Sequence, residues 1–195
     1  MSRIGGWLFR HRTSLPLPVV AILLLVPPER NGPSTWTLLP LAGAIVVTAG
    51  ELLRLWGVHH IGVISRTRTD RLGPLIDSGP FGLVRNPLYL GNLLIWAGFA
   101  ASARLLWLLP AVVGGMALAY HAIVRWEERL LESRIGESYR RYTTRVPRWI
   151  PRVAAPPATP ASNGFTWRET LFSERGTLIA IAAGYGLLAA KALAI

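Results

Sequence analysis

Residues 73–89 (GPLIDSGPFGLVRNPLY) form a glycine- and proline-rich stretch that could bind a polar ligand. Glycine permits unusual backbone angles and proline fixes others, so this stretch suits neither a long helix nor a strand. Its exposed backbone amides and carbonyls could therefore grip a polar ligand at a membrane surface. The alternative is a plain interfacial loop that leads into a helix.

Residues 125–142 (RWEERLLESRIGESYRRY) carry a pair of adjacent carboxylates, Glu127 and Glu128. Apolar and tyrosine side chains recur every three or four residues from Leu131 to Tyr142, which predicts a helix with one such stripe. The two carboxylates follow an apolar run directly. Carboxylates at that depth in a membrane cost free energy unless they are paired with a cation or take part in function. The alternative is a solvated amphipathic helix stabilised by Arg–Glu pairs across its turns.

The remaining polar residues do not predict a second catalytic or metal site. Glu51 and Arg54 lie three apart in an apolar run, so they could share a helix face and neutralise each other. The sequence has no cysteine, and its histidines lack partners at metal-ligand spacing, so we infer no metal site. It also lacks a GxGxxG phosphate loop and a GxSxG nucleophile turn.

Membrane helices are the elements that must position these stretches. Hydrophobic residues make up 51% of the 195-residue chain and charged residues only 16%, against about 25% in soluble domains. A helical span takes roughly 20 apolar residues. We therefore predict an all-α fold, a polytopic membrane helical bundle of about five transmembrane helices with a cytoplasmic amphipathic helix. The candidate spans are residues 13–26, 36–58, 88–103, 105–124 and 177–195.

The charges predict how the chain is oriented. The formal net charge is +11, and 20 of the 21 basic residues are arginine. They lie between apolar runs rather than on one soluble face, so we infer a lipid bilayer as partner and no nucleic acid. Arginines are concentrated in residues 59–85 and 125–152, which we place in the cytoplasm. Five spans then put the N-terminus inside and the turn at Arg104 outside, in what we expect to be a bacterial inner membrane.

The chain divides into three parts. Residues 1–152 form the predicted membrane core, and their first 26 residues look like a retained anchor rather than a removed signal, because Pro27-Pro28 follows in place of a cleavage site. Residues 153–176 form a linker and interfacial segment that is rich in proline and alanine in its first half. Residues 177–195 form a C-terminal transmembrane helix, from whose last turns Lys191 can reach the interface.

Two long motifs occur in order: SGPFGLVRNPLYLGN, then EERLLESRIGESYRRYTTRVPRWIP. Together they resemble the isoprenylcysteine carboxyl methyltransferase and phospholipid methyltransferase superfamily, whose members typically show GPY-x3-RHPxYxG followed by EExxL-x4-FGxxYxxYxxxVPRxxP. The resemblance covers about residues 52–151, near half of the chain. It implies an integral membrane enzyme that takes its methyl group from S-adenosyl-L-methionine.

The resemblance also implies a cofactor pocket at the cytosolic edge of the helical hairpin. In similar enzymes the segment ahead of the RHP stretch contacts the cofactor, and the paired carboxylates bind its polar end. The cofactor-binding residues implied here are Gly73, Pro74, Leu75, Ile76, Phe81, Asn86, Pro87, Leu88, Tyr89, Glu127 and Glu128.

Two positions depart from the family pattern. Asn86 replaces the usual histidine; it can hydrogen-bond but cannot titrate near neutral pH. Prenylcysteine-specific members carry an arginine where this chain has Ile123, and the nearby Arg125 lies about 200° round the helix from that position. We take Glu128, Asn86 and Arg125 as candidate catalytic residues, Glu128 as a possible proton acceptor for an amine substrate.

The expected function is methyl transfer to an amphipathic lipid-like or prenylated acceptor at the cytoplasmic face. Membrane sterol and steroid reductases resemble the same superfamily in their C-terminal cores, and the cytoplasmic arginines could dock the phosphates of their nicotinamide cofactor. A non-enzymatic membrane protein would also explain the hydrophobicity and the basic loops, but not the two motifs in family order.

Overall fold

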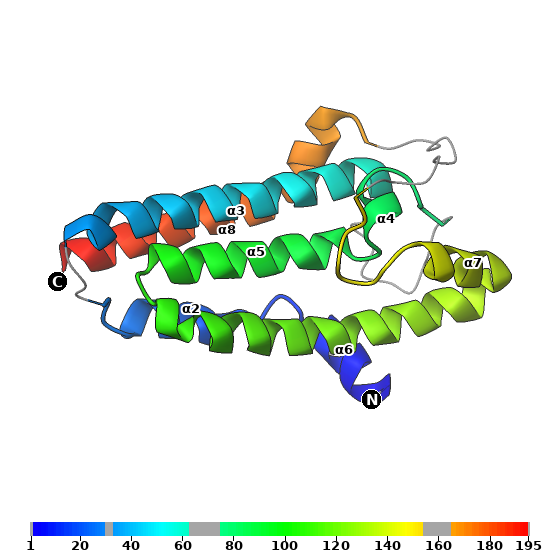
Figure 1. Cartoon of the computed structure of the whole chain (residues 1–195), viewed down its shortest axis with the longest axis horizontal. Coiled ribbons are helices and arrows are strands. Elements are labelled where there is room, and N and C mark those ends of the chain that lie inside the picture. Colours follow the sequence, from blue (N-terminus) through cyan, green and yellow to red (C-terminus); the bar gives the residue numbers. More distant parts are fainter. Residues whose placement is uncertain (1, 30–32, 63–74, 154–164, 195) are drawn as a thin grey trace.

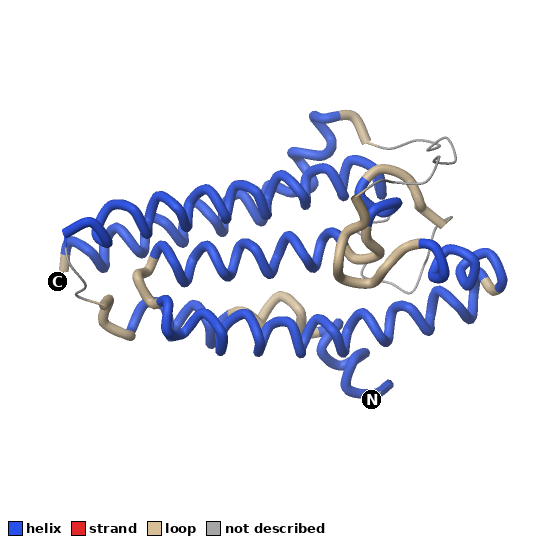
Figure 2. Tube along the Cα trace, viewed as in Figure 1, coloured by secondary structure: helices blue, strands red, loops and turns tan. Residues whose placement is uncertain are grey.

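The computed structural model describes residues 2–29, 33–62, 75–153 and 165–194, and it contains helices but no strands in these ranges. The all-α prediction is therefore confirmed for the described part of the chain (Figure 2). The elements are α1 (Ser2–Arg10), α2 (Leu17–Leu25), α3 (Pro33–Ile61), α4 (Pro80–Leu83), α5 (Pro87–Ser102), the 3-10 turn η2 (Leu106–Leu108), α6 (Leu109–Ile135), α7 (Glu137–Arg145) and α8 (Trp167–Leu193).

Within the described ranges, three helical segments are long and apolar enough to cross a membrane: Leu38–Ile61, Leu106–Ile135 and Trp167–Leu193. The 16-residue α5 is about 24 Å long and the nine-residue α2 about 14 Å, against a hydrocarbon thickness of about 30 Å. A polytopic helical bundle is thus supported by three spans, and the number of five stays a prediction.

The long helices run lengthwise beside one another (Figure 1). α5 packs between α3 and α6, and α8 packs along α3. The turn between α5 and α6 lies at one end of the bundle together with the end of α8. At the other end α4, α7 and the loop before α4 gather (Figure 1). This second end holds the two motifs identified in the sequence.

Paired glycines let α3 and α5 approach closely. A Cβ atom on Gly91 would lie 2.7 Å from the carbonyl oxygen of Gly50, and one on Gly98 would lie 2.6 Å from the carbonyl oxygen of Gly43. Real Cβ atoms do not approach backbone oxygens so closely, so both positions need glycine. Small residues at facing positions are typical of membrane helix pairs that pack by van der Waals contact.

A buried ion pair joins α8 to α3. Arg54 bonds Glu174 with 2.5 Å between Nη2 and Oε2, and it donates to Asn92 Oδ1 of α5 at 2.7 Å. The predicted pairing of Glu51 with Arg54 is present but longer, 3.5 Å between Oε2 and Nε. Arg54 therefore connects three helices rather than only neutralising its neighbour.

Two helix boundaries differ from the sequence-based expectation. The helix expected over residues 125–142 is divided: its first part continues α6 to Ile135, and α7 begins after Gly136, whose φ of 65° ends the first helix. α8 begins at Trp167, well before the expected start at 177, because Thr166 and Glu169 form a reciprocal capping box. The apolar run in the sequence starts at residue 177, so it predicted the later part of α8 and missed residues 167–176.

Candidate functional site

The glycine- and proline-rich stretch is folded around the short helix α4. Gly79, with φ of 56°, turns the chain, and Pro80 occupies the first turn of the helix. Phe81 is buried, and its carbonyl oxygen accepts a hydrogen bond of 2.8 Å from the hydroxyl of Tyr142 in α7. Burial raises the pKa of Tyr142, which keeps the hydroxyl protonated and able to donate.

A small apolar cluster joins the same stretch to α6 and α7. Tyr139, Tyr142 and Val146 are buried together, with Leu75, Leu131 and Ile135 packed against them. Leu75, a predicted cofactor-binding residue, is thereby held beside the helix that carries the acidic pair. The stripe of side chains seen in the sequence thus faces the first motif.

Three hydrogen bonds join the end of the first motif to the end of the second. The backbone N–H of Arg85 donates to the carbonyl of Pro147 at 2.9 Å, and that of Arg152 donates to the carbonyl of Leu83 at 3.0 Å. Between them, Asn86 Nδ2 donates to the carbonyl of Arg148 at 3.2 Å. Asn86 therefore lies at the start of α5 with its side-chain amide holding the second motif in place.

Glu128 is bound by two arginines. Arg85 Nη1 lies 2.8 Å from Oε1, and Arg148 makes a two-pronged contact with 2.6 Å between Nη2 and Oε2 and 3.0 Å between Nε and Oε1. The hydrogen bond to Glu128 raises the pKa of Arg148. Neither arginine was among the site residues predicted from the sequence. The available signal was that both lie close to a proline inside the two motifs, Arg85 two residues before Pro87 and Arg148 directly after Pro147.

Glu127 has a different environment. Its Oε2 accepts a hydrogen bond of 2.9 Å from the hydroxyl of Tyr89, in the first turn of α5. The ring of Tyr89 packs at 5.2 Å from that of Tyr120, which is buried on α6. The two acids of the pair thus face different partners: Glu128 faces two guanidinium groups and Glu127 a phenol.

The structure places the remaining predicted residues as follows. Pro87 is buried, Leu88 packs beside Gly57 of α3, and Ile76 is half-buried. Arg125 is exposed, and among the described residues it takes part in none of the bonds that join the two motifs. Gly73 and Pro74 lie outside the described residues. Their predicted contacts with a cofactor stay predictions.

The position that carries an arginine in prenylcysteine-specific members holds a core residue here. Ile123 is fully buried and packs with Met116 and Tyr120. It therefore supports the wall of α6 behind Glu127 and offers no charge to a substrate.

A helical membrane bundle whose two polar motifs meet at one end is the class of protein that the fold and the site define. The chain belongs to the phospholipid methyltransferase family, a family of membrane methyltransferases, and residues 39–138 match the family model. This range contains the first motif and the acidic pair but ends before Arg148.

Two relatives are similar over most of the chain. One is the nickel-cobalt-cadmium resistance protein NccN of Alcaligenes xylosoxydans xylosoxydans, 29% identical over 157 residues that cover 78% of this chain and 70% of the relative. The other is the cobalt-zinc-cadmium resistance protein CzcN of Cupriavidus metallidurans, 31% identical over 155 residues that cover 77% of this chain and 68% of the relative. No solved structure matches this chain.

Proposed function

We propose that this protein transfers a methyl group from S-adenosyl-L-methionine to a lipid-like or prenylated acceptor at the cytoplasmic face of the membrane. The observation that carries the proposal is the meeting of the two motifs. Residues 75–89 and the Glu127–Glu128 pair, far apart in the sequence, share one end of the bundle and are bonded through Arg85 and Tyr89, while Asn86 bonds the backbone of Arg148. The family membership supports the reaction class.

The described residues fit the polar end of such a cofactor. Glu127 is half-buried and can accept hydrogen bonds from an ammonium group or from ribose hydroxyls. The Nε of Arg85 is buried and has no hydrogen-bond partner among the described residues, so an acceptor such as a carboxylate would satisfy it. One acid and one unsatisfied guanidinium donor complement the two charged ends of an amino acid.

The protein's part in the reaction is mainly alignment. When bound, the cofactor supplies a methyl group on a positively charged sulfur. Holding two reactants in line can contribute roughly 7–11 kcal/mol in favourable cases, and it requires no nucleophilic side chain. The hydroxyl of Tyr89 positions Glu127, and the ion pair with Glu128 holds the Arg85 side chain in place. The role of Glu128 as a proton acceptor for an amine substrate stays a prediction, since two arginines already occupy its carboxylate.

The membrane setting explains how two unlike reactants could meet. The cofactor is water-soluble and a lipid acceptor is not, so the site must open toward both phases. The motifs lie at a helix end, where the apolar bundle meets its arginine-rich loops (Figure 1). By the excess of arginine in these loops we place this end in the cytoplasm.

The direct test is incubation of the purified protein with methyl-labelled S-adenosyl-L-methionine and host membranes, with the labelled product identified by mass spectrometry. We expect label in a lipid-extractable molecule, and much less of it with a Glu127→Gln variant at the same low cofactor concentration. No transfer to any lipid extract would count against the proposal. Retention by an immobilised nicotinamide dinucleotide, rather than by S-adenosylhomocysteine, would favour the reductase alternative instead.

The names of the two relatives suggest a biological readout. Both are called metal resistance proteins, for nickel, cobalt and cadmium and for cobalt, zinc and cadmium. If the acceptor belongs to the same process, cells that carry the Glu127→Gln variant should show altered tolerance to these metals. If the wild type transfers methyl groups but cells with the Glu127→Gln variant keep the same metal tolerance, methyl transfer is not part of metal resistance.

A further inference from the structure

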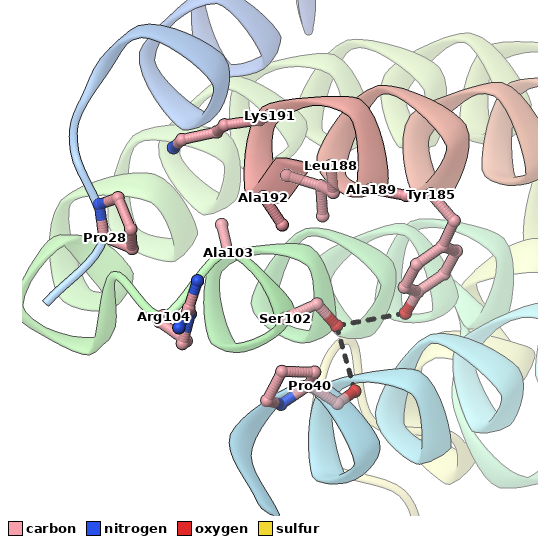
Figure 3. A pocket seen from close by; sticks show the side chains of 10 residues that line it. All are labelled: Pro28, Pro40, Ser102, Ala103, Arg104, Tyr185, Leu188, Ala189, Lys191 and Ala192. Carbon is pink, nitrogen blue, oxygen red and sulfur yellow. Dashed lines mark hydrogen bonds between the residues drawn. The ribbon is translucent and has the colours of Figure 1, made fainter. Parts of the chain in front are cut away.

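The end of the bundle opposite the two motifs contains a pocket with a volume of about 410 Å³ (Figure 3). It lies between the first part of α3, the turn after α5 and the last turns of α8. Its walls are mostly apolar and include Pro40, Ala103, Leu188 and Ala192. The cavity belongs neither to the candidate methyl-transfer site nor to its two motifs.

Arg104 places a guanidinium group in this wall. The side chain is buried, with 8% of the residue exposed, and the backbone has a φ of 57°, which is unfavourable for any residue except glycine. The turn is held by its N–H, which donates to Ala101, and by its carbonyl, which accepts from the N–H of Glu29 at 3.1 Å. The fold therefore keeps an arginine at a position where glycine would be less strained.

Lys191 supplies a second positive charge from α8. Its Nζ donates to the carbonyls of Leu23 at 2.7 Å and Val26 at 2.5 Å, at the end of α2. Those bonds fix the ammonium group at the pocket wall, on the same side as Arg104 (Figure 3).

The polar groups of the pocket favour an anion. Ser102 Oγ donates to the carbonyl of Pro40 at 3.3 Å and lies 3.1 Å from the hydroxyl of Tyr185 (Figure 3). The described residues of the lining include two cationic side chains and two hydroxyls, and none of these residues carries a carboxylate. Glu29, whose backbone N–H donates to the Arg104 carbonyl, is not among the described lining residues. A phosphate here would be attracted by the two cationic side chains, because hydrogen bonds between charged groups are stronger than neutral ones.

We propose that this pocket binds the phosphate headgroup of an anionic lipid, in the leaflet at this end of the bundle. Three observations select a lipid rather than a free anion. The walls are mainly apolar, the pocket lies at the helix ends where headgroups are expected, and Leu106, Trp107 and Leu193 are exposed nearby on the same turn and helix end. Exposed tryptophan and leucine at a helix end are typical of a bilayer interface. The inference is independent of methyl transfer.

The experiment measures the thermal unfolding of the delipidated full-length protein in detergent, with added phosphatidylglycerol, phosphatidylcholine or inorganic phosphate. We expect phosphatidylglycerol to raise the melting temperature by several degrees and the other two to have little effect. Equal stabilisation by phosphatidylcholine would overturn the role of charge. Equal stabilisation by inorganic phosphate would overturn the choice of a lipid.

Variants test the two cations. Arg104→Gly keeps the backbone conformation that the turn requires, and Lys191→Gln keeps donors for the α2 carbonyls. Each should weaken phosphatidylglycerol binding at least tenfold, measured as retained lipid by native mass spectrometry. Arg168→Gln removes one charge from the exposed first turn of α8 and is the matched control. Retention that falls equally in the control, or in none of the variants, would overturn the proposal.

Discussion

Arg148 grips the carboxylate of Glu128 across 20 residues of sequence, with 2.6 Å between Nη2 and Oε2. The same carboxylate accepts from Arg85, so one acid of α6 bonds both motifs at once. The link between the two motifs at this point therefore depends on one half-buried carboxylate.

Replacing Glu128 should therefore destabilise the protein. Glu128→Ala leaves two largely buried guanidinium groups without this carboxylate, which costs on the order of 3 kcal/mol. We expect a clearly lower melting temperature in detergent and loss of methyl transfer. The control is Glu132→Ala, which removes an exposed partner of Arg140 and should change stability by about 0.5 kcal/mol or less. A similar loss of stability in both variants would show that the ion pairs of Glu128 do not stabilise the fold more than an exposed ion pair does.

Glu127→Gln should weaken cofactor binding while the fold stays intact. The change keeps the size of the side chain and its contact with Tyr89 but removes the charge that an ammonium group would meet. A hydrogen bond to a charged group contributes about 1.5–3 kcal/mol, equivalent to roughly 10- to 150-fold in affinity. Titration calorimetry with S-adenosylhomocysteine in detergent measures it. Tyr89→Phe should act in the same direction but less strongly, and unchanged affinity in Glu127→Gln would remove Glu127 from the site.

Gly98 should tolerate no side chain. Even a single Cβ there would meet the backbone of Gly43 and the side chain of Val47, so Gly98→Val should separate α3 from α5 and sharply reduce the folded yield. Gly114 on α6 has open space around its Cα, and Gly114→Ala should leave stability equal or raise it, because alanine favours helix by about 0.8–1 kcal/mol. Size-exclusion profiles and thermal unfolding of the two variants distinguish these outcomes. Normal folding of Gly98→Val would show that the helices need not touch there.

Arg54 should make Glu51 and Glu174 interdependent. Either acid can be replaced by glutamine while the other still faces the guanidinium, so each single variant should be mild. The double variant leaves Arg54 buried without a carboxylate and should lose more than the two single losses added, by about 0.5–3 kcal/mol. Unfolding midpoints of the four proteins give this coupling. Strict additivity would mean that Glu51 does not share the ion pair.

Local features of the sequence were enough to locate most helices. Apolar runs placed the three long spans, since a segment that must stay in hydrocarbon needs continuous apolar residues whatever it packs against. The span expected over residues 88–103 lies within one residue of α5, which begins at Pro87 and ends at Ser102. The break at Gly136 was missed because the three- and four-residue spacing of apolar side chains continues across it, so the stripe alone did not show that α7 is separate.

The two motifs, including the acidic pair, could be read from the sequence, but their partners could not. Residue types and spacing identified Glu127 and Glu128 as acids at a membrane boundary, where a carboxylate must be paired or used. Which acid meets Tyr89 and which meets Arg85 and Arg148 depends on how α5, α6 and the segment after α7 pack together. Side chains that lie 20 to 43 residues apart have no fixed spacing, so only the tertiary structure decides their pairing.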